Sequence, residues 1–346
     1  MKIAFIGTNG IPNSYGGFES FLESICPKLV QDGHEIFVTC DPIHHSRLEP
    51  AYKGANKIYI DIRANGPLST IHDLVAFFRC LFIANKIVVL GVSAGPFFPI
   101  FRVACQVLGK TLIVNIDGVE WRRTKFNLPV RALLWAYDFL AQLSANKIVY
   151  DNNALLEFVM SPFRGKSVYA AYPADQVLIS AGNSQIKNHC LTICRIEPEN
   201  NIEMIIEGFL KSKLELYTIV GNWKKSRYGM ALKSKFSNNP RLNLLDPVYD
   251  QNTLSQIRSS CSIYVHGHSV GGTNPSLIEM IGYKCYLVCF DCKFNQDSVG
   301  GDASYFADSS ELSIELDRLK DKALLVQRKI PDRFTSEYIA NLYASI

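Results

Sequence analysis

The regular alternation of short apolar segments with longer amphipathic ones constrains the fold of this chain most. In the first half, apolar segments typical of strands lie at 2–7, 34–39, 57–61, 87–90, 111–116, 147–151 and 168–171. Segments with helical periodicity lie between them, at 18–31, 69–83, 97–108, 129–144 and 153–160. Strands that alternate with helices predict a parallel sheet covered by helices. We therefore expect an α/β domain over residues 1–172.

The second half repeats this pattern after a predicted linker at 173–188. Strands are predicted at 189–195, 216–220, 242–245, 262–266 and 285–290, and helices at 201–212, 225–236, 251–260 and 275–283. A second α/β domain over 189–325 follows, and 346 residues exceed what one core usually supports. Residues 310–346 are expected to be helical. Their last part, 326–346, carries an apolar stripe that can pack back on the first domain.

Composition narrows the class of protein. A net charge of +4 is too small for a dedicated nucleic-acid binder, so we expect no nucleic-acid partner. No apolar run reaches the roughly 20 residues of a membrane span. The chain begins with a predicted strand and not with a signal peptide, which predicts a cytoplasmic protein. Ten scattered cysteines are then expected to be free thiols. Cys289 and Cys292 form a CxxC without a second pair, which favours a structural role over zinc.

Residues 264–280 are the richest stretch for function. A strand end is followed by Gly271, Gly272 and Thr273, and then by Asn274 and Pro275, which are typical of a helix start. Backbone N–H groups at such a start favour an anion, usually a phosphate. Glu279 follows within the helix and suits the hydroxyls of a ribose, so the stretch indicates a nucleotide site. An ordinary strand-to-helix turn with a solvated Glu279 is the alternative.

Arg195 ends the first predicted strand of the second half. Carboxyl ends of parallel strands meet at one edge of a sheet, where α/β proteins bind ligands. Arg195 and the loop 271–274 can therefore face one pocket, and the planar guanidinium suits a diphosphate. The alternative is a surface ion pair of Arg195 with Glu197 or Glu199.

The first half places other polar groups at the same kind of edge. Glycines at 7, 10, 16 and 17 do not fit the dinucleotide fingerprint G-x-G-x-x-G, and the loop more plausibly lines a cleft. Asp117 follows a strand and can act as a general base or as an anchor for a hydroxyl group. A turn residue before Gly118 is the alternative for Asp117.

Four segments together resemble a known family. They are GTNGIP…YGGFE at 7–19, DGVEW at 117–121, RIEPENN at 195–201 and HGHSVGGTNPSLIE at 266–279. With two tandem α/β domains, they are similar to GT-B glycosyltransferases of family four, and closer still to a bacterial rhamnosyltransferase subgroup of capsule, exopolysaccharide and O-antigen synthesis. The resemblance covers nearly the whole chain.

The resemblance implies two Rossmann-like doubly wound domains facing a central cleft, and a sugar transferred with retention of configuration. The nucleotide-sugar donor, dTDP-rhamnose or a UDP-sugar, would lie on the second domain, and closure of the domains would exclude water. The implied catalytic residues are Asp117, Arg195 and Glu279. The implied donor-binding residues are Gly16, Gly17, Arg195, Asn200, Gly271, Gly272, Thr273, Asn274 and Glu279. The implied acceptor-binding residues are Asn9, Tyr15, Glu120, Trp121 and Arg122.

Two positions depart from the wider family, which has Lys where this chain has Asn200 and Glu where it has Gly271. Backbone N–H groups of Gly272, Thr273 and Asn274 are expected to compensate for the missing cation. The chain has no Asp-x-Asp motif, so we expect no metal and no cofactor besides the donor substrate.

A lipid-linked oligosaccharide is the acceptor that the resemblance implies, with the protein peripheral on the inner face of the cell membrane. Arg79, Lys86 and Arg102 flank apolar helices. A second basic and aromatic cluster comprises Trp121, Arg122, Arg123, Lys125 and Arg131. Such surfaces favour an anionic leaflet. Ordinary solvated faces are the alternative.

Three other functions stay open. A GT-B epimerase or hydrolase would turn over donor without acceptor. A sugar-nucleotide-binding scaffold or sensor would bind donor without forming product, and Asn200 and Gly271 motivate that reading. A nicotinamide oxidoreductase is disfavoured by the missing fingerprint.

Overall fold

The computed structural model describes residues 1–13, 16–43, 45, 49–122, 126–175, 188–322 and 328–346. The chain forms two compact units. Unit 1 comprises Met1–Pro173 and Asp332–Ile346, and unit 2 comprises Ala174–Pro331. The chain thus returns to unit 1 for its last helix. Most of the predicted linker, 176–187, lies outside the described residues.

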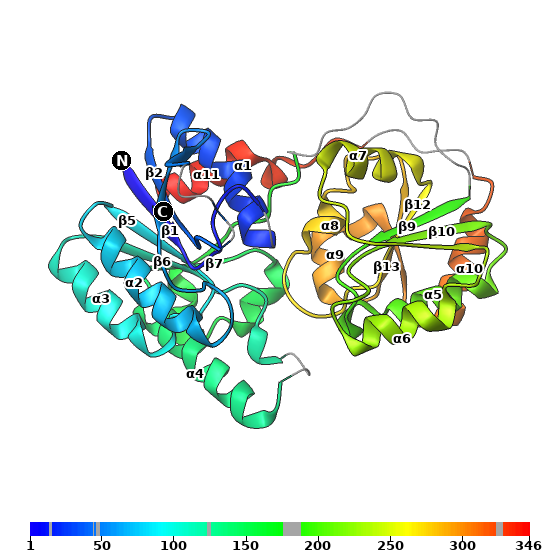
Figure 1. Cartoon of the computed structure of the whole chain (residues 1–346), viewed down its shortest axis with the longest axis horizontal. Coiled ribbons are helices and arrows are strands. Elements are labelled where there is room, and N and C mark those ends of the chain that lie inside the picture. The colour runs from blue at the N-terminus through cyan, green and yellow to red at the C-terminus, as the bar shows by residue number, and fades with distance from the viewer. Residues whose placement is uncertain (14–15, 44, 46–48, 123–125, 176–187, 323–327) are drawn as a thin grey trace. The chain divides into compact units, whose positions relative to one another are not determined.

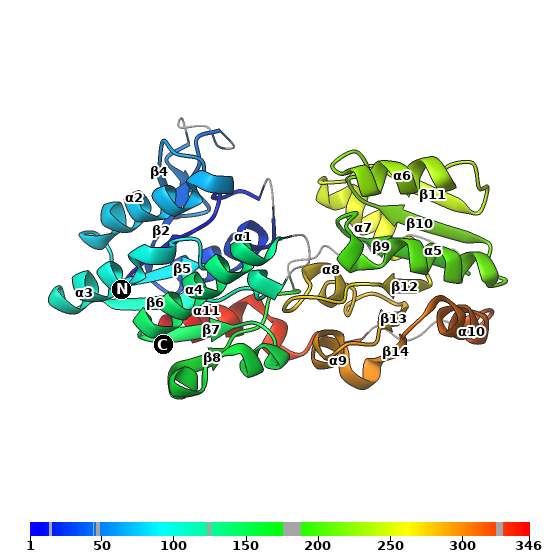
Figure 2. The same ribbon diagram turned by 90° about the horizontal axis from the view of Figure 1, so that it is seen from below.

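Unit 1 is built on an eight-stranded sheet with the order β3-β4-β2-β1-β5-β6-β7-β8 (Figures 1 and 2). The strands are β1 Lys2–Ile6, β2 Glu35–Cys40, β3 Ala51–Tyr52, β4 Ala55–Tyr59, β5 Lys86–Leu90, β6 Thr111–Asn115, β7 Lys147–Tyr150 and β8 Ser167–Tyr169. All neighbours pair in parallel except β3, which is antiparallel to β4. The strand order reverses between β1 and β5, as in a doubly wound sheet.

Helices cover both faces of this sheet. They are α1 Gly17–Gln31, α2 Ser69–Leu81, α3 Phe98–Val107, α4 Leu128–Ser144 and α11 Ser336–Ser345, with 3-10 turns η1 Gly66–Leu68, η2 Gly95–Phe97, η3 Glu120–Arg122, η4 Asn153–Phe158, η5 Ser161–Lys166 and η8 Asp332–Phe334. Right-handed crossovers place α1 on one face and α2, α3 and α4 on the other. Helix α11 packs beside α1, and α3 contacts both α2 and α4 (Figure 1).

Helix α11 is held in unit 1 by buried polar contacts as well as by its apolar stripe. Nζ of Lys86 donates to the carbonyl oxygens of Tyr343 at 3.0 Å and Ala344 at 2.8 Å. Nδ2 of Asn115 donates to the Tyr343 hydroxyl at 3.1 Å. The Tyr343 ring packs edge-on against Phe21, with ring centroids 5.4 Å apart. Lys86 therefore caps the end of a helix, which corrects its predicted place on a basic surface: the residue is 5% exposed.

Unit 2 is built on a six-stranded, wholly parallel sheet with the order β11-β10-β9-β12-β13-β14. The strands are β9 His189–Ile193, β10 Leu216–Val220, β11 Leu242–Leu245, β12 Ile263–His266, β13 Tyr286–Phe290 and β14 Ala303–Phe306. The helices are α5 Ile202–Lys211, α6 Arg227–Phe236, α7 Gln251–Ser260, α8 Pro275–Ile278, α9 Lys293–Val299 and α10 Ser309–Leu319, with turns η6 Pro198–Asn200 and η7 Gly300–Asp302. Figure 2 shows the strands in this order.

Several predicted elements differ in the structure. The strand predicted at 57–61 is β4, Ala55–Tyr59, because a tight turn pairs it with β3. The helix predicted at 153–160 is a 3-10 helix over Asn153–Phe158 and not an α-helix. The helix predicted at 275–283 stops at Ile278, since the next N–H groups bond three residues back, for example Met280 to Leu277. Three short elements, β3, α9 and β14, were missed, and residues 310–346 hold two separate helices.

Within the described residues, none of the helices has the length and apolar character that crossing a bilayer requires. The prediction of free thiols is confirmed, because all ten cysteines are unpaired and eight are buried. Burial raises the pKa of the Cys289 and Cys292 thiols, so both are held protonated. No group of three or more His, Cys, Asp or Glu that could hold a metal occurs in the described part of the chain.

The contact between Lys86 and α11 generates a pH-dependent prediction. Burial lowers the pKa of Lys86 to about 8, from an ordinary value of 10.5. Between these values the unfolded state binds more protons, so this group adds stability as pH rises. We expect the unfolding free energy of the wild type minus that of Lys86→Met to grow from about pH 8 to about pH 10, by at most about 1.4 kcal/mol per pH unit.

Urea titrations of both proteins at several pH values measure this difference. Titration of other groups cancels in the subtraction. A difference that is flat or falling across the window would show that Lys86 is not a desolvated lysine in the folded protein.

Candidate functional site

The strand order of unit 2 defines where a ligand can bind. Numbered along the chain, its strands lie in the order 3-2-1-4-5-6, which reverses between β9 and β12. In such sheets, a crevice forms outside the carboxyl ends of the strands on either side of the reversal. The segments that leave β9 and β12 there are Arg195–Asn201 and Gly267–Asn274. Arg195 and the glycine loop therefore lie at the same edge, as the sequence predicted.

Asn200 joins these two segments. Its Nδ2 donates to the carbonyl oxygen of Arg195 at 2.7 Å, and its Oδ1 lies 2.7 Å from Nδ1 of His268. Ser269 adds a backbone bond to the Glu199 carbonyl at 3.0 Å. We predicted that Asn200 binds the donor, but its side chain is committed to the protein and the residue is 3% exposed. Its role is therefore to hold Arg195 and the glycine loop in register.

Gly267 makes the close approach of the two segments possible. A Cβ at this position would lie 2.2 Å from the carbonyl oxygen of Asn200. Asn201, in the left-handed region at φ 51°, donates from Nδ2 to the Gly267 carbonyl at 2.8 Å. The segments after β9 and β12 thus form one bonded structure.

Two buried histidines, His266 and His268, belong to the segment where β12 ends. Since Nδ2 of Asn200 is already used by Arg195, its Oδ1 accepts, and His268 carries a proton on Nδ1. His266 ends β12, and burial, helped by the neighbouring His268, lowers its pKa well below the ordinary value. His266 is therefore neutral, and Arg195 supplies a positive charge at this edge.

Arg195 is exposed, and its guanidinium has no hydrogen-bond or ion-pair partner among the described residues. The predicted alternative, a surface ion pair with Glu197 or Glu199, is therefore not formed. An exposed arginine on a fixed backbone, at the edge where α/β sheets bind ligands, can receive an anion.

The glycine loop ends in the predicted cap. Oδ1 of Asn274 accepts from the backbone N–H of Ser276 at 3.1 Å and from its hydroxyl at 2.8 Å, and Pro275 occupies the first helical turn. Gly271 has φ 110°, which only glycine adopts freely. Helix α8 is a single turn, so its dipole is small. An anion at this position would be attracted mainly by the backbone N–H groups of Gly271–Asn274.

Glu279 follows α8 and forms an ion pair with Arg258 of α7 through Oε2. The side chains of Arg258 and Glu279 are 4% and 13% exposed. Burial raises the pKa of Glu279, and the charge of Arg258 opposes that rise. The other carboxylate oxygen, Oε1, has no partner in the described part of the chain. Sequence reasoning missed Arg258, because nothing along the chain links it to Glu279.

Unit 1 also has polar residues at the carboxyl edge of its sheet, near the point where the strand order reverses between β1 and β5. We call this the polar edge of unit 1. The buried Glu19 of α1 holds the loop after β1: its Oε1 accepts from the Thr8 hydroxyl at 2.7 Å and from the Asn9 N–H at 2.9 Å. Asn9 is 1% exposed, and its Oδ1 accepts from Asn65 at 2.9 Å. The predicted acceptor residue Asn9 thus shapes this loop from within.

Asp117 lies two residues after the end of β6 and has φ 54°. Its N–H donates to Oδ1 of Asn115 at 3.0 Å, and Asn115 is itself bonded to Tyr343. Val119, a β-branched residue, also has positive φ, at 51°. Such strain is tolerated where a structure fixes the backbone, and it is enriched at functional sites. The Asp117 carboxylate has no partner among the described residues.

The other predicted acceptor residues are placed differently. Nε1 of Trp121 donates to Oδ2 of the buried Asp138 at 3.1 Å, so its indole anchors η3 to α4. Arg122 is exposed and stacks over the Phe158 ring, 4.9 Å from its centroid. Glu120 is half-buried in η3. Tyr15, with Arg123 and Lys125 of the basic cluster, lies outside the described residues.

Gly16 and Gly17, predicted to bind the donor, belong to unit 1. Gly16 precedes α1 with no side-chain cap, and Gly17 is the first residue of that helix. The remaining predicted donor-binding residues, from Arg195 to Glu279, all belong to unit 2.

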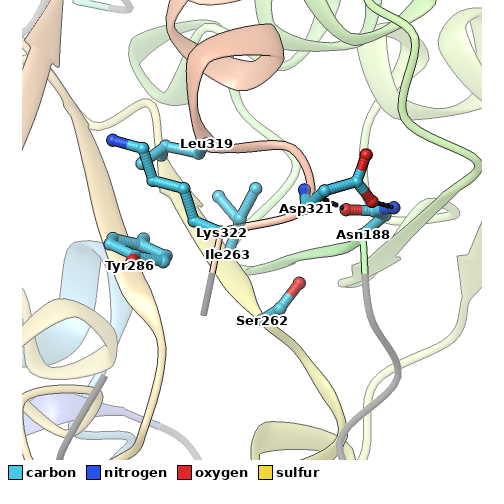
Figure 3. A pocket seen from close by; sticks show the side chains of 7 residues that line it. All are labelled: Asn188, Ser262, Ile263, Tyr286, Leu319, Asp321 and Lys322. Atoms are coloured by element: carbon cyan, nitrogen blue, oxygen red, sulfur yellow. Dashed lines mark hydrogen bonds between the residues drawn. The ribbon is translucent and has the colours of Figure 1, made fainter. Parts of the chain in front are cut away.

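The described residues also line a hollow in each unit. A cavity of about 420 Å³ in unit 1 is lined by Asp41, Pro42, Ile43, Asp61, Ile62, Arg63, Leu68 and Ile71. It borders the Asn9 loop, because the N–H of Asp41 donates to the Asn9 carbonyl at 2.9 Å. A cavity of only about 10 Å³ in unit 2 lies beside the reciprocal pair Asn188–Asp321, at the amino edge of the sheet (Figure 3). That volume suffices for about one water molecule.

The family of the chain is defined by its first half. Residues 1–175 match the family described as "Domain of unknown function (DUF1972)", which is just over half of the 346 residues. The chain therefore belongs to the DUF1972 family. A comparison with the curated protein sequences found no match.

Solved structures of low sequence identity share the fold. Sucrose-phosphate synthase from Thermosynechococcus elongatus is 12% identical with a TM-score of 0.71, over 99% of this chain and 92% of that one. An α,α-trehalose-phosphate synthase (UDP-forming) from Burkholderia xenovorans is 9% identical with a TM-score of 0.66, over 99% and 98%. A putative UDP-N-acetylglucosamine 2-epimerase from Listeria monocytogenes is 11% identical with a TM-score of 0.62, over 98% and 93%. The predicted fold class is confirmed: the chain has the GT-B fold, with two parallel-sheet α/β domains.

The ion pair of Arg258 and Glu279 generates a prediction for stability. Removing one partner of a buried pair leaves an uncompensated charge, which costs about 3–5 kcal/mol. We expect Arg258→Met to destabilise the protein by about this much. Adding Glu279→Gln should then recover part of the loss, because the isolated carboxylate is gone.

Urea denaturation of the wild type, both single variants and the double variant closes the cycle. Strictly additive effects would mean that the two side chains are not coupled in solution.

Proposed function

We propose that this protein is a glycosyltransferase that moves a sugar from a nucleoside-diphosphate sugar to an acceptor. One observation carries the proposal: an unpaired arginine and a glycine loop are bonded into one structure at the reversal point of a doubly wound sheet. That arrangement is suited to a diphosphate flanked by a sugar and a ribose. The GT-B fold agrees with this function.

The donor is proposed to bind unit 2. The Arg195 guanidinium binds the diphosphate through charge-assisted hydrogen bonds, and the N–H groups of Gly272, Thr273 and Asn274 add donors. Oε1 of Glu279 accepts from a ribose hydroxyl while Arg258 holds Oε2. These fixed groups stabilise the negative charge that develops as the nucleoside diphosphate leaves. The proposal involves no metal, because Arg195 and the loop already supply donors to that charge.

The acceptor is proposed to bind unit 1. Asp117 has an open carboxylate on a backbone fixed by Asn115, so it can accept a hydrogen bond from the acceptor hydroxyl and orient it. Retention of configuration, as in family four, gives Asp117 this positioning role and not that of a nucleophile. Glu120 and Arg122 follow in the same segment and can contact the glycan.

The finer identity rests on the motifs at 7–19, 117–121, 195–201 and 266–279. They support rhamnose as the transferred hexose, dTDP-rhamnose as donor, and a lipid-linked glycan of bacterial surface polysaccharide as acceptor. A lipid-linked acceptor in turn supports a protein that is peripheral on the cytoplasmic side of the membrane. A UDP-linked donor is the alternative, as in the UDP-forming trehalose-phosphate synthase that shares the fold.

A second candidate is a nucleotide-sugar epimerase. The similarity to a putative UDP-N-acetylglucosamine 2-epimerase covers 98% of this chain and favours it as a specific alternative. Such an enzyme would consume or isomerise its donor with no acceptor present, so product analysis without acceptor separates the two functions.

Thermal-shift titration with TDP, UDP, GDP and NAD tests the donor site. A ligand that binds only the folded state at a hundred times its Kd adds about 2.7 kcal/mol of stability. We expect one nucleoside diphosphate to raise Tm. Arg195→Ala should weaken its Kd by about 10- to 100-fold, because a hydrogen bond to a charged group contributes about 1.5–3 kcal/mol.

Lys213→Ala is the matched control, since it removes an exposed cation near the opposite, amino edge of the same sheet. It should leave the Kd unchanged. Stabilisation by NAD alone, or equal loss of binding in both variants, would contradict the proposed donor site.

A further inference from the structure

The outer face of α2, α3 and α4 in unit 1 is unusually apolar. Ile71, Phe78 and Phe82 follow one stripe of α2 and its end, with exposed fractions of 43%, 42% and 75%. On α3, Ile100, Val103 and Val107 repeat at helical spacing and are 49%, 61% and 78% exposed. On α4, the members are Leu128, Leu133 and Trp135, at 76%, 50% and 47%. We call these nine residues the apolar face.

The three helices lie next to one another on one side of the sheet. Crossovers in the same direction place them on the same side of the sheet, and α3 contacts both of its neighbours (Figure 1). Helices in the outer layer of an α/β domain normally turn polar residues outward. Large exposed apolar side chains gathered on three neighbouring helices are typical of a binding surface for a protein or a membrane.

Charge indicates which occupant the apolar face has. Helices α2, α3 and α4 contain two carboxylates, Asp73 and Asp138, and both are buried, at 1% and 4% exposed. The same helices carry Arg79, Arg102 and Arg131, and Arg79 is exposed. The face is thus apolar with positive charge and without an exposed acidic residue. Apolar side chains among arginines match an anionic bilayer, where basic groups meet the headgroups and apolar groups enter the acyl boundary.

One end of the apolar face lies close to the polar edge of unit 1. Ile71, at the start of the α2 stripe, lines the cavity of about 420 Å³. Asp41, on the wall of the same cavity, bonds to the Asn9 loop. An acceptor whose lipid stays in a bilayer on this face could therefore present its glycan at that edge.

We propose that the α2–α3–α4 face docks unit 1 on an anionic lipid surface. The inference deepens the proposed function by naming the residues through which the enzyme reaches a membrane-held acceptor. Only the biological reason for docking rests on the proposed function. Lipid binding itself needs no donor and no catalysis.

Co-sedimentation of the full chain with vesicles tests the proposal. We expect binding to vesicles of phosphatidylcholine with phosphatidylglycerol, and much weaker binding to phosphatidylcholine alone. Added salt should weaken binding, since headgroup attraction is screened. Arg79→Gln and Arg102→Gln should each reduce the partition coefficient roughly fivefold.

The decisive variant replaces three strongly exposed members of the face: Phe82→Glu, Val103→Glu and Val107→Glu. It should lose vesicle binding by more than about tenfold, because three apolar side chains are removed and negative charge is added. The control variant, Met230→Glu, Ile314→Glu and Tyr338→Glu, changes side chains that are 51%, 69% and 49% exposed elsewhere on the protein. It should bind vesicles as the wild type does, within the small change expected from added charge.

Each other outcome overturns the proposal. Failure of the wild type to bind anionic vesicles, or equal losses in both triple variants, would show that this face does not bind lipid. A dimer detected by light scattering that only the Phe82, Val103 and Val107 variant breaks would assign the face to a second copy. Nucleoside-diphosphate binding, measured in the same variants, should be unchanged, so failure of docking is distinguishable from failure of the proposed function.

Discussion

The site of unit 2 depends on the pair of hydrogen bonds made by Asn200. One bond holds the Arg195 carbonyl and the other holds His268, so the segments after β9 and β12 keep a fixed separation at the reversal point of the sheet. Gly267 permits the contact, since any side chain would meet the Asn200 carbonyl. The cation and the glycine loop are thereby positioned before a ligand arrives, which is what electrostatic stabilisation of a leaving group requires.

In unit 1, the polar edge is likewise held in place by buried hydrogen bonds, and these involve a helix that is far away in the sequence. Lys86 holds the end of α11, the Tyr343 hydroxyl of that helix accepts from Asn115, and Oδ1 of Asn115 accepts from the N–H of Asp117. The last helix of the chain therefore supports the turn that presents the Asp117 carboxylate. Buried residues behind the polar edge of each unit thus decide where its polar groups lie.

The sequence predicted the larger part of this organisation. Alternating strands and helices placed Arg195 and the loop 271–274 at one sheet edge, and Asn274 caps α8 as expected. The pairing of Arg258 with Glu279 joins α7 to the residue after α8, and such contacts across elements leave no periodic signal. Asn200 and Lys86 were misplaced for the same reason: a polar residue next to a predicted site or helix looks exposed until its buried partners are known. The length of α8 was overestimated because the apolar residues after Ile278 form turns. The backbone N–H groups of these turns bond three residues back and not four.

A structure of the protein with the nucleoside diphosphate that stabilises it would test the central claim most directly. Our account predicts the diphosphate at the carboxyl edge between β9 and β12, within hydrogen-bond distance of the Arg195 guanidinium and of backbone N–H groups in 271–274. The ribose should lie against Oε1 of Glu279, with Oε2 still bonded to Arg258. A nucleotide bound at another edge of unit 2, or on unit 1 alone, would contradict the account.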